Sequence, residues 1–143
     1  MSGFITELEV RKAGAGPQGR QTWKLLQALV YQSDRLGRHV TVPAGFVTDY
    51  ASVPRLPFAF WLAGDTAHEA AVVHDWLYTS HEVDRKTADA VFAEAMRVSD
   101  PSAPAGLMWL AVRVAGGGSW RSPGPTQPPM VRAVLDERDR QAA

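Results

Sequence analysis

The spacing of apolar residues changes near residue 65, and this change does most to limit the folds open to the chain. Residues 1–55 contain short runs rich in β-branched and aromatic residues, which are separated by the turn-rich segment "AGAGPQGRQ" and interrupted by Pro43 and Gly45. Residues 65–116 instead carry apolar side chains at the intervals of amphipathic helices. We therefore predict an α+β fold, with a small N-terminal antiparallel β-meander of about three or four strands, then a helical hairpin and a third helix.

Capping signals predict where the helices begin and end. The first helix runs through "AHEAAVVHDWLY", with Asp65 or Thr66 as N-cap and Glu69 completing a capping box. The second follows Asp84 through "RKTADAVFAEAMRV" and ends at "SDPSAP". The segment "TSHEV" joins these two into an antiparallel hairpin. A third helix, residues 103–115, is expected to stop at "GGGS".

The length of 143 residues predicts a single domain, which we assign to residues 1–120. Residues 121–143 differ in composition, because the proline-rich spacer "RSPGPTQPP" precedes the amphipathic segment "MVRAVLDERDRQAA". We expect an extended arm with a short terminal helix that needs a surface to lie on.

Charge and cysteine content exclude several functional classes. The 15 basic and 15 acidic residues cancel, so no overall field attracts a nucleic acid or an anionic membrane. The absence of cysteine excludes disulfides, thiolate metal ligands and a cysteine nucleophile. The start "MSGFITELEV" lacks the features of a secretory signal, so we expect the protein to be made in the cytoplasm. No apolar segment reaches the ~20 residues of a transmembrane helix.

A histidine and two carboxylates lie in the predicted helical hairpin, where ionisable groups are costly unless they are paired. Asp89 falls on the apolar face of the second helix, since Phe92 follows it by three residues. We expect a ring N–H of His74 to donate to Asp89, and the hydroxyl of Tyr78 to support the same carboxylate. His74 would then be a general base that takes a proton from water.

Other residues near this pair predict a metal site. Asp75 is expected to hold a hard divalent cation, with Asp49 of "FVTDYASVPR" as a second carboxylate ligand. Ser52 and Arg55 of the same segment, and His68, almost two helical turns before Asp75, are candidate accessory groups. Two alternatives stay open: Asp49 and Ser52 only cap a turn, and the His-Asp pair is a satisfied structural network without chemistry.

Four segments in order, "FVTDYASVPR", "HDWLY", "ADAVF" and "LMWLAVRVAGGGSW", resemble an uncharacterised domain-of-unknown-function family common in tailed phages and prophages. The resemblance covers about half the chain, from Phe46 to Trp120. It implies provenance in a phage genome. For such a protein, made in the cytoplasm of a bacterial host, we expect incorporation into the virion or its tail, with phage structural proteins or further copies of itself as partners. The resemblance implies no activity.

A second resemblance concerns "HDWLY" with "DAVFAEAM", which together are similar to the catalytic helix pair of phospholipase A2, particularly the small prokaryotic enzymes. It implies that His74 is the base, that Asp75 is a Ca²⁺ ligand, and that Asp89 with Tyr78 supports His74. It also implies a lipid or other cell-envelope substrate. The chain departs from that family in lacking cysteine and a glycine-rich calcium loop before the helix.

Three functional hypotheses follow. The first is a phage-encoded, metal-assisted hydrolase that cleaves an ester, amide or phosphodiester bond of the host envelope. The second is a non-catalytic component of a phage particle, at the tail tip, in a connector or in tail assembly, in which the His-Asp pair is a structural or relic metal site. The third is a metal-dependent phosphohydrolase of the all-helical His-Asp type, which the strand-rich N-terminus and the close spacing of His68 and His74 disfavour.

Overall fold

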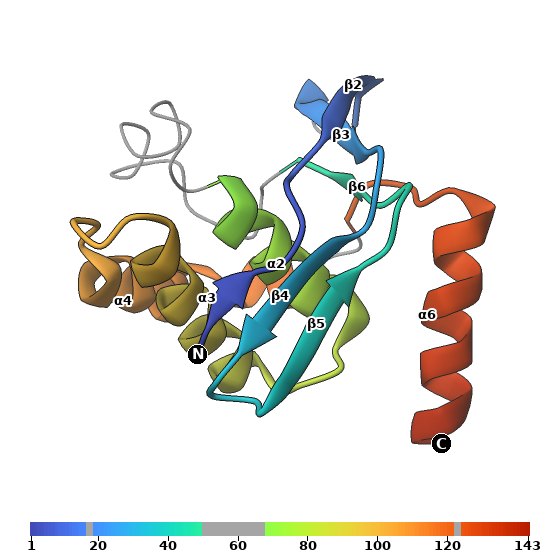
Figure 1. Cartoon of the computed structure of the whole chain (residues 1–143). Coiled ribbons are helices and arrows are strands. Elements are labelled where there is room, and N and C mark those ends of the chain that lie inside the picture. Colours follow the sequence, from blue (N-terminus) through green and yellow to red (C-terminus); the bar gives the residue numbers. More distant parts are fainter. Residues whose placement is uncertain (17–18, 50–67, 122–123) are drawn as a thin grey trace.

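The computed structural model describes residues 1–16, 19–49, 68–121 and 124–143 (Figure 1). Its N-terminal part forms two three-stranded antiparallel sheets, with strand orders β1-β4-β5 and β2-β3-β6. The strands are β1 (Gly3–Phe4), β2 (Val10–Ala15), β3 (Gln21–Leu25), β4 (Leu29–Ser33), β5 (Arg38–Val42) and β6 (Val47–Thr48). Helices follow, so the α+β class is confirmed.

The strands form two sheets and not the single meander predicted from the sequence, because two segments each contribute to both sheets. Residues 22–32 are divided between β3 and β4, and residues 38–49 between β5 and β6. At the second division Gly45 has a φ of 87°, a left-handed conformation that favours glycine, and its N–H donates to the carbonyl of Leu25. The chain therefore changes sheet where Pro43 and Gly45 had indicated only a break.

The helices largely follow their predicted positions. They are α2 (His68–Ser80), α3 (Arg85–Ser99), α4 (Ala105–Ala115), α5 (Gly117–Arg121) and α6 (Pro129–Ala142). Asp84 is the N-cap of α3, as predicted, and its carboxylate accepts the N–H of Thr87 at 2.7 Å. The caps predicted at Asp65 and Thr66 lie outside the described residues.

The third helix, α4, ends at Ala115 before "GGGS", as predicted, but the expectation that the glycines prevent any helical continuation is wrong. After Gly116 the chain continues as the short helix α5, and the N–H of Trp120 donates to the carbonyl of Gly116 at 3.0 Å. Glycine lowers helix propensity by only about 1 kcal/mol, which tertiary contacts can offset. The contacts here are made by Trp120, whose ring packs edge-on against Tyr78.

The core lies between the β1-β4-β5 sheet and the helices α2 and α3, and α4 packs on α3 (Figure 1). Nearly every residue of α2 is buried, and Trp76 meets Phe46 in an edge-to-face contact with ring centroids 5.3 Å apart. Full burial of one large apolar side chain contributes roughly 1.5–3 kcal/mol. A helix this buried holds its polar residues in a fixed, largely dry environment, which positions the site described below.

The C-terminal arm docks on the body of the protein. The amide of Gln127 pairs with the backbone of Val47, since the Val47 N–H donates to Oε1 and Nε2 donates to the Val47 carbonyl, each at 2.8 Å. On α6 Val131 is fully buried, and Arg138 forms an ion pair with Glu82. Figure 1 shows α6 on the side of the molecule away from α4. Among the helices that the structure describes, none is long and apolar enough to cross a bilayer.

Candidate active site

The predicted His-Asp pair is present between α2 and α3. Nε2 of His74 lies 2.8 Å from Oδ1 of Asp89, and both side chains have no solvent exposure. The two residues face each other because α2 and α3 are antiparallel neighbours joined by a short turn. Phe92 covers one side of the imidazole, with ring centroids 4.8 Å apart.

The carboxylate of Asp89 is fully compensated. Its Oδ1 also accepts the hydroxyl of Tyr78 at 2.6 Å, as predicted, and its Oδ2 accepts Nη1 of Arg113 at 2.8 Å. The guanidinium of Arg85 lies 4.0 Å from Oδ2. Four donors or cations from three helices thus surround one buried carboxylate, which is the condition for keeping such a group ionised.

Arg85 fixes the end of α4 beside this carboxylate. Its Nη2 donates to the carbonyls of Val112 at 3.0 Å and Arg113 at 2.6 Å, and its Nε donates to the hydroxyl of Tyr78 at 3.3 Å. These carbonyls belong to the last turn of α4, where a cation is favourable, and the Val112 carbonyl also accepts the N–H of Gly116 at 2.8 Å. Arg85 therefore holds in place the helix end from which Arg113 reaches Asp89.

Burial is the largest influence on the protonation of this pair. Burial acts to raise the pKa of Asp89, but hydrogen bonds from His74, Tyr78 and Arg113 outweigh it, so the pKa of the carboxyl lies below its usual value. Burial lowers the pKa of His74 more strongly than Asp89 raises it. Burial and the bond to Asp89 raise the pKa of Tyr78, which keeps its hydroxyl a donor. The result is a neutral imidazole whose Nε2–H donates to a carboxylate.

Gly116 lets Tyr78 reach its position. A Cβ added at Gly116 would lie 2.5 Å from the hydroxyl oxygen of Tyr78, closer than real contacts allow. The turn between α4 and α5 therefore packs directly on the Tyr78 hydroxyl. On the other side the ring of Trp120 contacts Tyr78 edge-on, with centroids 5.1 Å apart.

The two predicted metal ligands belong to neighbouring segments. Asp75 on α2 accepts the hydroxyl of Thr48 on Oδ2 at 2.5 Å, and Asp49 directly follows Thr48 at the end of β6. Asp75 and Asp49 are nearly buried, at 7% and 6% exposure, whereas we expected Asp75 to point toward an open mouth. Across residues 1–16, 19–49, 68–121 and 124–143, no three His, Asp or Glu side chains are grouped to hold a metal ion.

Of the three predicted accessory groups, only His68 lies within the described residues. His68 is the first residue of α2 and is partly buried. Its role as a ligand stays a prediction. Ser52 and Arg55 lie outside the described residues.

A comparison with protein-family models shows which family the chain belongs to. Residues 23–112 match the family described as protein of unknown function, DUF1353. The chain belongs to this family. No curated protein and no solved structure gives a significant match.

In this DUF1353 protein the matched range runs from β3 to the last turn of α4. It includes His74, Tyr78, Arg85 and Asp89, and it ends one residue before Arg113. The match thus covers the helix pair that carries the buried network, while the family description assigns it no activity. The expected relationships to phages and to phospholipase A2 stay predictions.

Sequence reasoning missed three residues of this network in the DUF1353 protein. Arg85 precedes Asp89 by four residues on α3, a spacing that brings side chains together and was a usable signal. Arg113 is the one charged residue of "AGLMWLAVRVAGG", and a charge inside an apolar helix indicates a buried partner. Thr48 gave no signal, because its contact with Asp75 depends on how β6 packs on α2.

Proposed function

We propose that the chain is a hydrolase in which His74 is the general base. The observation that carries the proposal is the 2.8 Å contact from His74 Nε2 to an Asp89 carboxylate that Tyr78 also holds, at 2.6 Å. An imidazole oriented in this way by a carboxylate is a recurrent device of general-base catalysis. The order of residues in "HDWLY" and "DAVFAEAM", which resembles phospholipase A2, supports the same roles.

The proposed reaction uses the neutral form of His74. Nδ1 takes a proton from water as the water oxygen forms a bond to the carbonyl carbon or phosphorus of the substrate. The same proton then passes from Nδ1 to the leaving oxygen or nitrogen as the bond to it breaks. Asp89 keeps its charge throughout, because Arg113 and Tyr78 stay bonded to it, and it stabilises the imidazolium that forms between the two proton transfers.

We also propose that Asp75 and Asp49 bind a divalent cation. The described residues supply two carboxylates there, which suits a hard cation in ligand type but falls short of the six to eight oxygens that Ca²⁺ takes. A bound cation would polarise the substrate oxygen. Calorimetry of the full chain with Ca²⁺, Mg²⁺, Mn²⁺ and Zn²⁺ tests this, and Asp75→Asn should remove any heat of binding. A wild-type chain that binds none of the four excludes the cation.

The setting is proposed from resemblance. We infer a phage-encoded protein that is virion- or tail-associated, and a host-envelope ester, amide or phosphodiester as its substrate. The similarity of Phe46 to Trp120 to phage domains of unknown function supports this origin.

The test is hydrolysis by the full chain of three substrate types: fluorogenic phospholipid vesicles, p-nitrophenyl esters and bis-(p-nitrophenyl) phosphate. His74→Ala should lower the rate on any cleaved substrate by about 10²–10⁴, the usual contribution of a general base. His39→Ala is the matched control, because His39 is exposed on β5. The nitrogen chemical shifts of His74 give a readout without substrate, since the proposal requires the proton on Nε2 at neutral pH. An equal rate in wild type and His74→Ala, or a proton on Nδ1, contradicts the proposal.

A structural role is the second candidate, and burial favours it. His74 and Asp89 have no solvent exposure, and each carboxylate oxygen of Asp89 already has a hydrogen-bond donor within the protein. In a non-catalytic component of a phage particle this network would only join α2, α3 and α4. Under this hypothesis His74→Ala and Asp89→Ala lose folding stability to a similar extent and no substrate is cleaved. Under the hydrolase hypothesis Asp89→Ala costs more stability, because it leaves a buried imidazole without its partner.

A further inference from the structure

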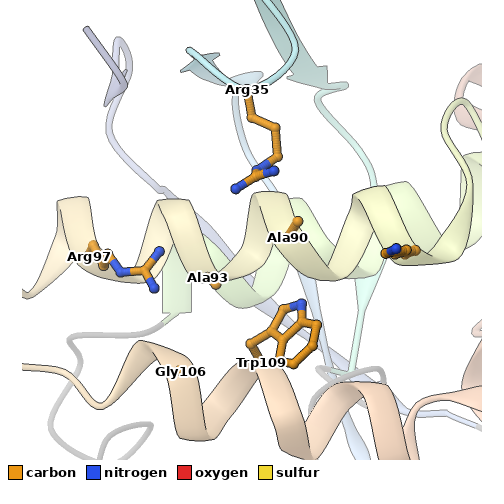
Figure 2. A pocket seen from close by; sticks show the side chains of 7 residues that line it. Arg35, Ala90, Ala93, Arg97, Gly106 and Trp109 are labelled. Atoms are coloured by element: carbon orange, nitrogen blue, oxygen red, sulfur yellow. The ribbon is translucent and has the colours of Figure 1, made fainter.

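A groove of about 330 Å³ crosses the outer face of α3 (Figure 2). Three cationic side chains line it: Arg35 from the turn between β4 and β5, and Lys86 and Arg97 from α3. Trp109 of α4 forms the opposite wall. The remaining lining residues are small, namely Ala90, Ala93 and Gly106.

The cations of this groove form no ion pair with the described carboxylates. Among the described residues, no carboxylate lies within 4.0 Å of the charged groups of Arg35, Lys86 or Arg97. The carboxylate of Glu94 lies beside Arg35, but it accepts the hydroxyl of Tyr31 at 2.9 Å and the backbone N–H of Arg35 at 3.0 Å and forms no ion pair with the guanidinium. A chain without net charge thus places three cations that form no close ion pair with a described carboxylate around one groove.

We propose that this groove binds a phosphomonoester carried on an organic molecule. A phosphomonoester carries about −1.5 to −2 charges at neutral pH and three strong acceptor oxygens, which suits three cations better than a single carboxylate does. Two of the three are arginines, whose planar forks bind phosphate oxygens in pairs. Figure 2 shows Arg35 reaching over Ala90, and Arg97 directed toward Ala93, so both cations border the same small-residue floor.

The rest of the ligand has an apolar surface to contact. Trp109 offers its indole at the groove wall, and the volume falls at the lower end of the range for small-molecule sites. Beside the groove α4 exposes an apolar stripe: Leu107, Leu110 and Val114 are 55%, 51% and 79% exposed. Leu110 follows the groove residue Gly106 by four positions, which places the two on adjoining surface. The phosphate can therefore come from a soluble molecule or from the headgroup of a lipid.

The experiment titrates the full chain with phenyl phosphate, inorganic phosphate and benzoate, and separately measures co-sedimentation with vesicles that contain phosphatidic acid. We expect phenyl phosphate to bind more tightly than benzoate. Arg35→Ala and Arg97→Ala should each weaken binding about tenfold, the effect of removing one charged hydrogen-bond donor. Arg132→Ala is the control, because this arginine is exposed on α6, away from the groove.

The two sources of phosphate give different results. A soluble ligand predicts binding of phenyl phosphate that Leu110→Ser does not change. A lipid source predicts sedimentation with the vesicles that Leu110→Ser and Arg97→Ala both reduce. The proposal is overturned if neither probe binds, if benzoate binds as tightly as phenyl phosphate, or if Arg97→Ala and Arg132→Ala have equal effects. None of these measurements depends on His74, so failure of the hydrolase proposal leaves the test intact.

Discussion

The charged side chains on the inner and outer faces of α3 differ in burial and in pairing. On the inner face Asp89 is completely buried and meets donors from α2, α3 and α4. On the outer face Lys86 and Arg97 lie at the surface, and Arg35 adds a third cation; in the part of the chain that the structure describes, none of the three charged groups has a carboxylate within 4.0 Å. Solvent and salt screen exposed charges, whereas a buried charge must be compensated within the protein. Pairing on the inner face is therefore required for folding, and the convergence of cations on the outer face is not.

The largest expected effect follows from removing the inner charge. Asp89→Asn should lower the free energy of unfolding by about 3–5 kcal/mol, because it leaves Arg113 and His74 with a poorer acceptor inside the core. Arg97→Gln, on the outer face of the same helix, should leave it nearly unchanged. Urea unfolding of the two variants and the wild type measures both. If the two variants lose similar amounts of unfolding free energy, pairing of charge is no more important for folding on the inner face than on the outer face.

A smaller effect is expected from the glycine that lies against Tyr78. Gly116→Ala places a Cβ within 2.5 Å of the Tyr78 hydroxyl, so either the hydroxyl leaves Asp89 or the junction of α4 and α5 shifts. We expect a loss of about 1–3 kcal/mol, the usual cost of overpacking. Gly118→Ala is the matched control, since a Cβ there has nothing within 4 Å. Thermal unfolding measures the stability of both variants and the wild type. If Gly116→Ala is as stable as the wild type, Tyr78 is not confined by this turn.

The smallest expected effect is a dependence of stability on pH. The pKa of His74 is lowered by burial, so below the ordinary value of 6.5 the unfolded chain binds a proton that the folded chain does not. Stability should therefore fall as the pH drops below 6.5, by at most about 1.4 kcal/mol per pH unit. Asp89, whose pKa is also lowered in the folded state, adds a further loss only below its ordinary value of 3.8.

His74→Gln should abolish the loss between pH 6.5 and 5, whereas the exposed His39→Gln should retain it. Urea unfolding at a series of pH values gives the slopes. An identical slope in wild type and His74→Gln would show that His74 does not titrate differently on folding.

The contact between His74 and Asp89 on the inner face could be predicted from the sequence, because it depends only on residues that are close together in the chain. Asp89 lies on the apolar stripe of its helix, and His74 lies on the preceding helix across a short turn, so periodicity and one connection place them together. Arg113 comes from α4 and required the packing of a third helix. Because Arg113 is the one charged residue in an apolar segment, a buried partner could be predicted for it. The sequence spacing does not identify Asp89 as that partner.

The sheets and the groove could not be predicted in the same way. Whether residues 22–32 form one strand or two depends on which neighbours pair with each half, and those pairs are made by β1, β5, β2 and β6. The groove joins Arg35 to Lys86 and Arg97 across the interface between a strand turn and α3. Exposed cations have no periodic pattern, because the solvent accepts them at most surface positions.

The amide of Gln127 has a consequence for how this protein behaves among copies of itself. Val47 belongs to β6, an edge strand of its sheet, and unpaired backbone groups at such an edge can recruit a strand from another molecule. By occupying both the N–H and the carbonyl of Val47, one side chain shields that edge from strand addition. The C-terminal arm thus also covers backbone groups through which a second molecule could extend this sheet.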